Sequence, residues 1–201
     1  MKTSLLNDNN IKEAKKIIRE SFKLIRNNLD DDFIRDKSAV IFKKFKNIVN
    51  INKFASISVY IDFNNEVSTY EIINYALKNN IKVSVPFIID NHNMKLKYIN
   101  DYDKDINRNT KFGCGEPFEY CKDCNIEEVS MFIIPALAFD EKCGRLGFGN
   151  GYYDNILRTN KNALRIGLAY DYQILPSIPK DDNDEILDII ISESKVITAT
   201  F

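Results

Sequence analysis

The apolar run Met131-Phe-Ile-Ile-Pro135 constrains the fold of this 201-residue chain more than any other segment. All of its side chains are apolar, so a strand formed by this run has no polar face to turn toward water. Strands of this kind lie at the centre of parallel sheets that carry helices on both faces. The run therefore predicts an α/β fold in three layers, with a mostly parallel central sheet flanked by helices.

The apolar periodicity of the remaining chain supplies further elements for this fold. Helical spacing predicts helices over residues 11–29, 33–49 and 152–158. In the first of these the apolar stripe includes Ile17, Ile18 and Ile25, and Lys and Arg occupy the other face. Alternating or continuous apolar residues predict strands over 54–61, 81–86, 95–99, 131–135, 164–169 and 186–191. Residues 100–128 are polar with interspersed Gly and Pro, which predicts a long loop.

Local signals refine the segment from 54 to 86. Its order of strand, helix and strand predicts a parallel pair joined by a right-handed crossover. Ser68 and Glu71 match a capping box, which predicts a helix that starts there and continues to about Leu77. We expect the second strand to end at Pro86, because proline has no N–H to donate to a central ladder. No internal repeat or linker is evident, so residues 1–201 are predicted to form a single domain.

Charge and histidine content exclude several classes of function. The chain has 28 Lys and Arg against 29 Asp and Glu, which argues against a surface built throughout for nucleic acid but allows a local basic site. Because His92 is the one histidine, sites with two or three His ligands are excluded. We expect His92 to be exposed and inert, and the chemistry to depend on carboxylates, Lys and Arg, backbone amides and a bound ion.

Hydropathy and cysteine usage bear on location. No stretch approaches the roughly 18 apolar residues of a membrane span, and the first residues lack the hydrophobic region of a signal peptide. We therefore expect a cytoplasmic protein with no membrane partner and with reduced cysteines. Cys121 and Cys124 form a C-x₂-C pair near Cys114 and Cys143, so a zinc site is an alternative, although a zinc ribbon needs two such pairs.

A glycine-rich segment, Gly144-Arg-Leu-Gly-Phe-Gly-Asn-Gly-Tyr-Tyr-Asp154, precedes a predicted helix and holds four of the seven glycines within eight residues. Its glycines could turn successive N–H groups toward one anion, and the helix start would add further free N–H groups. Arg145 could pair with a phosphate. The alternative is a turn needed only for tight packing, because the spacing matches neither the dinucleotide-binding fingerprint nor a P-loop.

Several charged residues have both a functional and a structural interpretation. Asp154 is either a helix cap or a Mg²⁺ ligand, and the acidic cluster over 181–188 could supply a second ligand or form a solvated turn. Lys15 and Arg19 are four residues apart on one helix face, which is typical of exposed surface but could form a binding face. Glu66 follows the first strand, where α/β sheets bind ligands, unless it merely faces water.

Pro135-Ala-Leu-Ala-Phe-Asp140 and the glycine-rich segment resemble the signature of the 5-formyltetrahydrofolate cyclo-ligase family, also called 5,10-methenyltetrahydrofolate synthetases. The resemblance covers nearly the whole chain and also includes Lys15-x-x-x-Arg19, Arg35 with Ser38, Glu66-Val-Ser-Thr69, Pro86, Gly115-Glu-Pro117, Ile166-Gly-Leu-Ala-Tyr170, Asn183-Asp184 and Asp188-Ile-Ile-Ile-Ser-Glu193. Its most specific part is Arg-Leu-Gly-x-Gly-x-Gly-Tyr-Tyr-Asp at 145–154. The chain departs from common family residues at Ala136, Asn150, Asn155 and Asn183, without losing a charge that the mechanism clearly requires.

This resemblance implies an enzyme that uses ATP and Mg²⁺ to convert 5-formyltetrahydrofolate to 5,10-methenyltetrahydrofolate, ADP and phosphate. Asp154 and Asp184 would hold Mg²⁺, and Ile61, Glu66 and Tyr152 would contact the folate. Lys15, Arg145 and Tyr153 would take part in catalysis. The family's ATP-binding residues would be Lys15, Arg19, Arg145, Leu146, Gly147, Phe148, Gly149, Asn150, Gly151, Tyr152 and Tyr153. We expect a monomer whose partners are ATP and 5-formyltetrahydrofolate, with no nucleic-acid partner.

The implied chemistry suits a chain with one histidine. In our hypothesis the formyl oxygen attacks the γ-phosphate, and N10 of the folate then adds to the activated carbon as phosphate leaves. The first step needs mainly positioning and charge neutralisation, and the second gains from intramolecular proximity. Two other classes stay open: a nucleotide-binding or sugar-phosphate-binding module without catalysis, and an interaction protein stapled by zinc.

Overall fold

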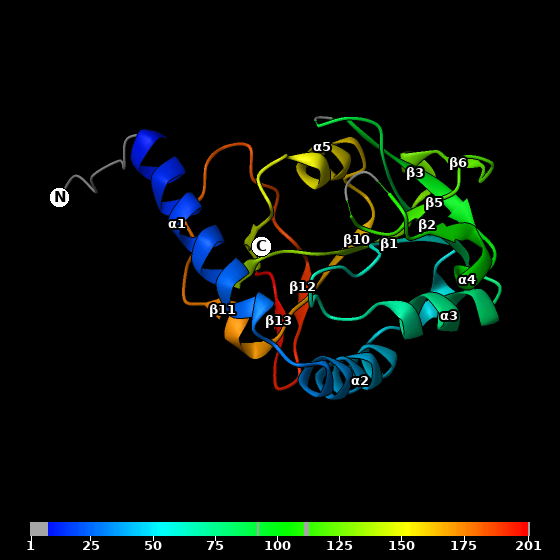
Figure 1. The fold of residues 1–201 in the computed structure, drawn as a ribbon, viewed down its shortest axis with the longest axis horizontal. Helices are drawn as coiled ribbons and strands as arrows, with labels where there is room; N and C mark the ends of the chain where they lie inside the picture. Colours follow the sequence, from blue (N-terminus) through cyan, green and yellow to red (C-terminus); the bar gives the residue numbers. More distant parts are fainter. Residues whose placement is uncertain (1–7, 92, 111–112, 201) are drawn as a thin grey trace.

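The computed structural model describes residues 8–91, 93–110 and 113–200, so the predictions for His92 lie outside the described residues. An eight-stranded sheet forms the centre, in the order β13-β12-β10-β7-β1-β2-β3-β6 (Figure 1). Its strands are β1 (Ser56–Val59), β2 (Lys82–Ile88), β3 (Met94–Ile99), β6 (Asp123–Cys124), β7 (Met131–Ile134), β10 (Leu164–Leu168), β12 (Ile189–Ile191) and β13 (Val196–Thr198).

The strand formed by the apolar run, β7, lies in the middle of this sheet. It pairs in parallel with β1 on one side and with β10 on the other. Parallel pairing continues outward from β1 to β2 and from β10 to β12, and antiparallel strands β3, β6 and β13 complete the two edges. The predictions of a central apolar strand and a mostly parallel sheet are confirmed, whereas β13 was not indicated by the sequence pattern.

Helices cover both faces of the sheet. Successive side chains of a strand point to opposite faces. Along β7, Ile133 belongs to the same core cluster as buried residues of α2 (Asp31–Ile48) and α3 (Tyr70–Lys78), and Phe132 to the cluster of α5 (Tyr152–Thr159). The predicted three layers are therefore confirmed (Figure 1). None of the helices within the described ranges is long and apolar enough to cross a membrane. The helices are α1 (Asp8–Asn27), α2 (Asp31–Ile48), α3 (Tyr70–Lys78), α4 (Tyr102–Asp105) and α5 (Tyr152–Thr159).

A second, three-stranded sheet extends from the end of β7 and carries the glycine-rich segment. Its middle strand β8 pairs in parallel with β11 and antiparallel with β9. The helix α1 packs beside β8, where Phe22 joins a small cluster with Leu137, Ala138 and Leu146. This sheet therefore places the glycine-rich segment between α1 and α5. Its strands are β8 (Ala138–Asp140), β9 (Arg145–Leu146) and β11 (Ile174–Leu175).

The prediction that the apolar stripe of α1 is its buried face is partly wrong. Ile17 and Ile25, both in the predicted apolar stripe, are 56% and 45% exposed. Lys15 and Arg26 are instead buried, at 5% and 2% exposure. The reason is that α1 does not lie on the apolar face of the central sheet, and long basic side chains can bury their methylene groups while their charged ends find partners.

The region 100–128 contains more regular structure than the predicted loop. The antiparallel pair of β4 with β5 and the edge strand β6 both fall within it. Elements of two to four residues are too short to carry a periodic pattern. The additional elements are α4, β4 (Ile106–Asn107), β5 (Glu116–Pro117), β6 and the 3₁₀ helix η2 (Ile126–Glu128).

The predicted strand end at Pro86 is wrong, because β2 continues to Ile88. The ladder between β1 and β2 stops at the pair Ser58–Ser84, whereas the antiparallel ladder with β3 includes Pro86 opposite Leu96. At Pro86, β2 therefore has a partner on one side only, and a proline is tolerated at such a position.

The predicted capping box at the start of α3 is also wrong. The N-cap residue is Thr69, and no side chain makes a capping hydrogen bond there. The Thr69 hydroxyl instead lies 2.7 Å from the carbonyl oxygen of Tyr60, and the Thr69 N–H donates to Asp62 Oδ1 at 3.0 Å. The helix start is thus fixed to the segment that follows β1.

This arrangement predicts opposite outcomes for two adjacent substitutions. Thr69→Ala should lower the free energy of unfolding by roughly 1–3 kcal/mol, because it removes a partner from buried polar groups. Ser68→Ala should change it by less than about 0.5 kcal/mol. Urea denaturation of both variants checks this, and an equal loss for Ser68→Ala would show that the capping box forms after all.

Candidate active site

The glycine-rich segment forms β9, a loop and the first turn of α5. Gly149 has φ +113° and Gly151, the N-cap of α5, has φ +72°. A residue with a Cβ is strained at such values, which explains why glycines stand there. The first backbone hydrogen bond of α5 runs from the Asn155 N–H to the Gly151 carbonyl oxygen. The N–H groups of residues 152–154 therefore have no partner within the helix. The loop and helix start therefore offer free donors to an anion.

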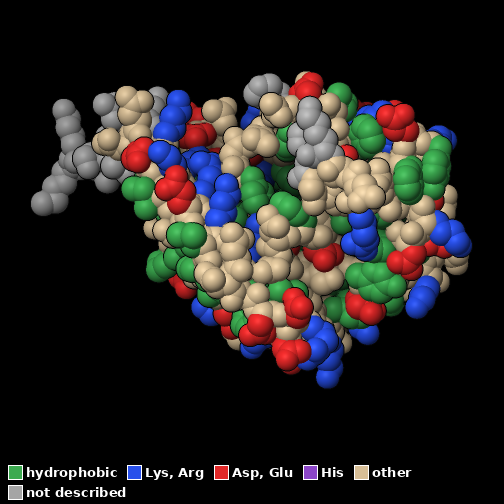
Figure 2. All heavy atoms as spheres, in the orientation of Figure 1, with side chains coloured by type: hydrophobic (Ala, Val, Ile, Leu, Met, Phe, Trp, Pro, Cys, Tyr) green, Lys and Arg blue, Asp and Glu red, His purple; other side chains and the backbone are tan. Residues whose placement is uncertain are grey.

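A cavity of about 430 Å³ opens in front of this loop. The loop, α1, the start of α5 and residues 181–184 line it. Among the described residues, five cationic side chains line it against three carboxylates. Figure 2 shows Lys and Arg side chains gathered over α1 at upper left, next to a hollow. The excess of positive charge suits an anionic ligand such as a polyphosphate.

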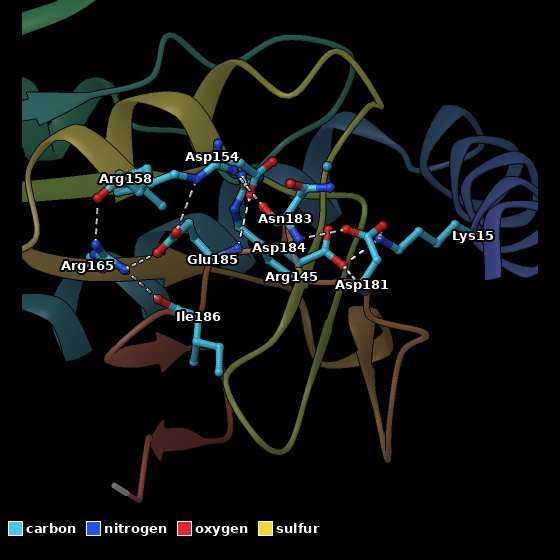
Figure 3. Close-up of polar contacts among 12 residues, drawn as sticks. Lys15, Arg145, Asp154, Arg158, Arg165, Asp181, Asn183, Asp184, Glu185 and Ile186 are labelled. Carbon is cyan, nitrogen blue, oxygen red and sulfur yellow. Dashed lines mark hydrogen bonds and ion pairs between the residues drawn. The ribbon is translucent and has the colours of Figure 1, made fainter. Parts of the chain in front are cut away.

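Two ion-pair systems organise the charges of this cavity (Figure 3). Lys15 reaches from α1 and donates to Asp181 at 2.6 Å and to Asp184. The hydrogen bond from Lys15 lowers the pKa of the Asp181 carboxyl. Arg145 donates from Nη2 to Asp154 Oδ1 at 2.6 Å, and Asp154 also accepts from the Glu185 N–H at 3.3 Å. Lys15 and Arg145 are thus both paired with carboxylates of the protein itself.

Two further contacts hold the loop in place. Arg19 donates from Nε to the carbonyl oxygen of Gly147 at 2.9 Å, which ties the loop to α1. The guanidinium of Arg145 lies 5.7 Å from the centre of the Tyr153 ring, and its Nε is buried without a hydrogen-bond partner. Burial raises the pKa of the Tyr153 phenol, so Tyr153 stays protonated at neutral pH and can donate a hydrogen bond.

A second cavity, of about 270 Å³, lies on the other side of the loop. Its lining is mainly apolar, with Ile61, Pro86, Ile88 and Met94 among its residues. It shares a wall with the first cavity, formed by Pro135, Phe148, Asn150, Tyr152 and Tyr153. The two cavities are therefore adjacent along this wall.

Glu66 is a buried carboxyl in the lining of the second cavity. Its Oε1 accepts from Arg26 Nη1 at 3.2 Å, and its Oε2 accepts from the Phe63 N–H at 3.2 Å. Burial raises the pKa of Glu66 to about 7, and the nearby Arg26 opposes that rise. The group therefore changes charge near neutral pH.

The residues that the resemblance implied as ligand contacts all line one or both of the two cavities. Asp154 and Asp184 line the first cavity, and Ile61 and Glu66 line the second together with Tyr152, which belongs to both. The contacts of these residues with ligands stay predictions. The eleven residues expected to bind ATP all line the first cavity: Lys15, Arg19, Arg145, Leu146, Gly147, Phe148, Gly149, Asn150, Gly151, Tyr152 and Tyr153.

Sequence reasoning missed Arg26 and the pairing role of Asp181. Arg26 follows Arg19 by seven residues, so both lie on the face of α1 that carries Lys15 and Phe22. That spacing was a usable signal. The partner of Arg26 was not visible, because Glu66 is 40 residues away and belongs to the segment after β1.

The residues of the structure fit the predicted magnesium site better than the alternative zinc site. Within the described part of the chain, no three His, Cys, Asp or Glu side chains are grouped so that they could hold a metal ion, and the four cysteines are free. This gives no support to the zinc alternative. Asp154 and Asp184 line one cavity and supply oxygen ligands, which Mg²⁺ prefers and which it usually supplements with phosphate oxygens and water.

Comparisons with known proteins agree on one family. A family model described as the 5-formyltetrahydrofolate cyclo-ligase family matches residues 11–193. A probable 5-formyltetrahydrofolate cyclo-ligase of Schizosaccharomyces pombe is 30% identical over 184 residues, which cover 84% of this chain and 90% of that protein. The solution structure of Aquifex aeolicus 5,10-methenyltetrahydrofolate synthetase superposes with a TM-score of 0.81 at 27% identity and covers 93% of each chain.

The state of Glu66 predicts a specific dependence of stability on pH. Between pH 4.5 and about 7 the folded protein keeps a proton on Glu66 that the unfolded chain releases, so the free energy of unfolding falls as pH rises. Glu66→Gln removes this penalty. Its stability relative to the wild type should rise through that window by up to roughly 3.5 kcal/mol and stay level at higher pH.

Denaturant unfolding at a series of pH values measures this difference. Glu71→Gln, at an exposed carboxylate of α3, is the matched control and should run parallel to the wild type. A Glu66→Gln curve that also ran parallel would mean that Glu66 titrates as an ordinary carboxyl.

Proposed function

The chain is an enzyme of the 5-formyltetrahydrofolate cyclo-ligase family, and we propose that it joins an ATP site to a folate site across the wall that its two cavities share. The reaction is the ATP- and Mg²⁺-dependent conversion of 5-formyltetrahydrofolate to 5,10-methenyltetrahydrofolate, with release of ADP and phosphate. The observation that carries this proposal is the shared wall of Pro135, Phe148, Asn150, Tyr152 and Tyr153. It allows the γ-phosphate and the formyl group to meet.

The chemistry of each cavity supports its assignment. The first is rich in cations and in free backbone N–H groups, as the triphosphate of ATP requires. The second is mainly apolar with a few polar groups, which suits a flat pteridine ring. With the triphosphate on one side of the wall and the pteridine on the other, the N5-formyl group faces the wall.

The reaction itself needs positioning more than acid–base chemistry. The formyl oxygen attacks the γ-phosphorus, and the bond to the ADP oxygen breaks. N10 then attacks the formyl carbon, the phosphate leaves with the oxygen, and the N10 proton is lost. Lys15 and Arg145 stabilise the charge of the transferred phosphoryl group, and the protonated Tyr153 phenol can donate to an oxygen at the wall.

Magnesium fits the residues of the first cavity. Asp154 and Asp184 would hold it, and when bound it would neutralise part of the phosphate charge. In the structure Asp154 pairs with Arg145, and Asp184 pairs with Lys15. Phosphate oxygens would take over as partners of both cations, which would leave the two carboxylates for the metal.

The decisive experiment follows the ultraviolet absorbance of the methenyl product. We expect product from 5-formyltetrahydrofolate only when ATP and Mg²⁺ are both present, together with one phosphate released for each product molecule. ATP binding without product or phosphate would contradict the proposal and support a nucleotide-binding module without catalysis.

The separation of the two cavities predicts a selective effect of Lys15→Met. Loss of a charge-assisted contact to phosphate should raise the KM for ATP by roughly tenfold or more. The KM for 5-formyltetrahydrofolate should change little, because Lys15 does not line the second cavity. Steady-state kinetics with each substrate varied in turn measures both values.

The matched control is Lys16→Met on the same helix, at an exposed position. It should leave both KM values unchanged. If the two variants behave alike, or if Lys15→Met raises both KM values equally, Lys15 has no direct role in nucleotide binding.

A further inference from the structure

Arg26 is a buried cation whose side chain contacts Glu66 and Phe148, two residues that line the cavities. It is 2% exposed, and the hydrogen bond from Nη1 to Glu66 Oε1 is the one that its side chain makes among the described residues. Its guanidinium carbon also lies 5.0 Å from the centre of the Phe148 ring. Phe148 lines both cavities and Glu66 lines the second, so Arg26 contacts the lining of each cavity.

Stability alone does not account for this residue. A buried ion pair rarely gains more than it loses by desolvation unless its hydrogen bonds are well satisfied, and apolar side chains in its place are often as stable. The hydrogen-bonding capacity of Arg26 is poorly satisfied. Its Nε is buried without a partner, and only one hydrogen bond joins its guanidinium to Glu66. A costly ion pair whose members contact the lining of both cavities points to a role in binding.

The surroundings of the Glu66 carboxyl define that role. The groups around it come from the segment after β1, from α1, from α5 and from the second cavity: Tyr60, Asp62, the Phe63 N–H, Arg26, Tyr153 and Cys114. Arg26 is the one cation among them. Without it the Phe63 N–H alone favours the carboxylate, against burial and the charge of Asp62.

We propose that Arg26 is a positioning residue, which favours the carboxylate form of Glu66 against the folate cavity and anchors the glycine-rich loop through Phe148. This inference rests on the proposed function, which assigns that cavity to 5-formyltetrahydrofolate. The amino-pyrimidine edge of a reduced pteridine offers N–H donors, and an ionised carboxylate is an acceptor on both oxygens. Folate affinity therefore follows the ionised fraction of Glu66.

The first test measures Glu66 itself, without any ligand. Carboxyl ¹³C NMR of glutamate-labelled protein, with the Glu66 signal assigned by Glu66→Gln, gives its titration midpoint in the wild type, in Arg26→Met and in Arg26→Lys. Arg26→Met should move the midpoint to higher pH by at least about one unit, and Arg26→Lys should keep it near the wild-type value. An unmoved midpoint in Arg26→Met overturns the inference.

The second test measures binding of 5-formyltetrahydrofolate by calorimetry across pH. At pH 7 the affinity of Arg26→Met should fall by at least about fivefold, with the affinity midpoint shifted to higher pH, and Glu66→Gln should make the Arg26 substitution nearly silent. The exposed Lys23→Met on the same helix controls for loss of one positive charge. Losses that simply add in the double variant would show that Arg26 does not act through Glu66.

Arg26→Lys separates the effect of Arg26 on Glu66 from its effect on Phe148. It can also be measured if Arg26→Met does not fold. Lysine keeps the charge beside Glu66 but not the planar group over Phe148, so the KM for ATP should rise several-fold while folate affinity is kept. An unchanged KM for ATP overturns the anchoring of the loop. A wild type that binds folate but forms no methenyl product would instead contradict the proposed function, and the Glu66 titration still decides the role of Arg26.

Discussion

The inward face of α1 carries positive charge into the protein, and the surrounding segments are arranged to neutralise it. Lys15 pairs with Asp181 and Asp184, Arg19 donates to the loop, and Arg26 pairs with Glu66. Each partner comes from a different part of the chain, so one helix brings three distant segments together. Buried charges tolerate no displacement of their partners, because an unpaired one is costly. The site depends on this face more than on any single catalytic side chain.

The central sheet determines where that helix finds its ligand cavities. Parallel strands present their carboxyl ends at one edge, where α/β folds bind ligands. Ile61 and Glu66 follow β1, and Pro135 follows β7, its neighbour in the sheet. Pro86 contributes from β2, next to β1 on the other side. The second cavity thus collects residues from three adjacent strands, and the glycine-rich loop separates it from the first.

Much of this could be predicted from the chain, and the failures have physical causes. The apolar run at β7 and the loop of 145–154 were informative because composition alone restricts what such segments can do. The buried face of α1 was misjudged, since apolar periodicity does not register arginine and lysine as buried residues. Thr69 replaced the expected capping box, because its partners Tyr60 and Asp62 come from another segment. Tertiary partners of this kind leave no local pattern.

The internal pairing of Lys15 and Arg145 also affects which anions can enter. Unpaired cations in an open hollow would project a long-range field and collect polyanions indiscriminately, in a manner that salt would weaken. Here Asp181, Asp184 and Asp154 act as built-in counter-ions, and they reduce the field that Lys15 and Arg145 project beyond the cavity. To pair with Lys15 or Arg145, an arriving anion has to replace these aspartates at contact distance. Selection at Lys15 and Arg145 is therefore exerted by exchange of partners at contact distance, in addition to the attraction that the remaining cations of the cavity supply.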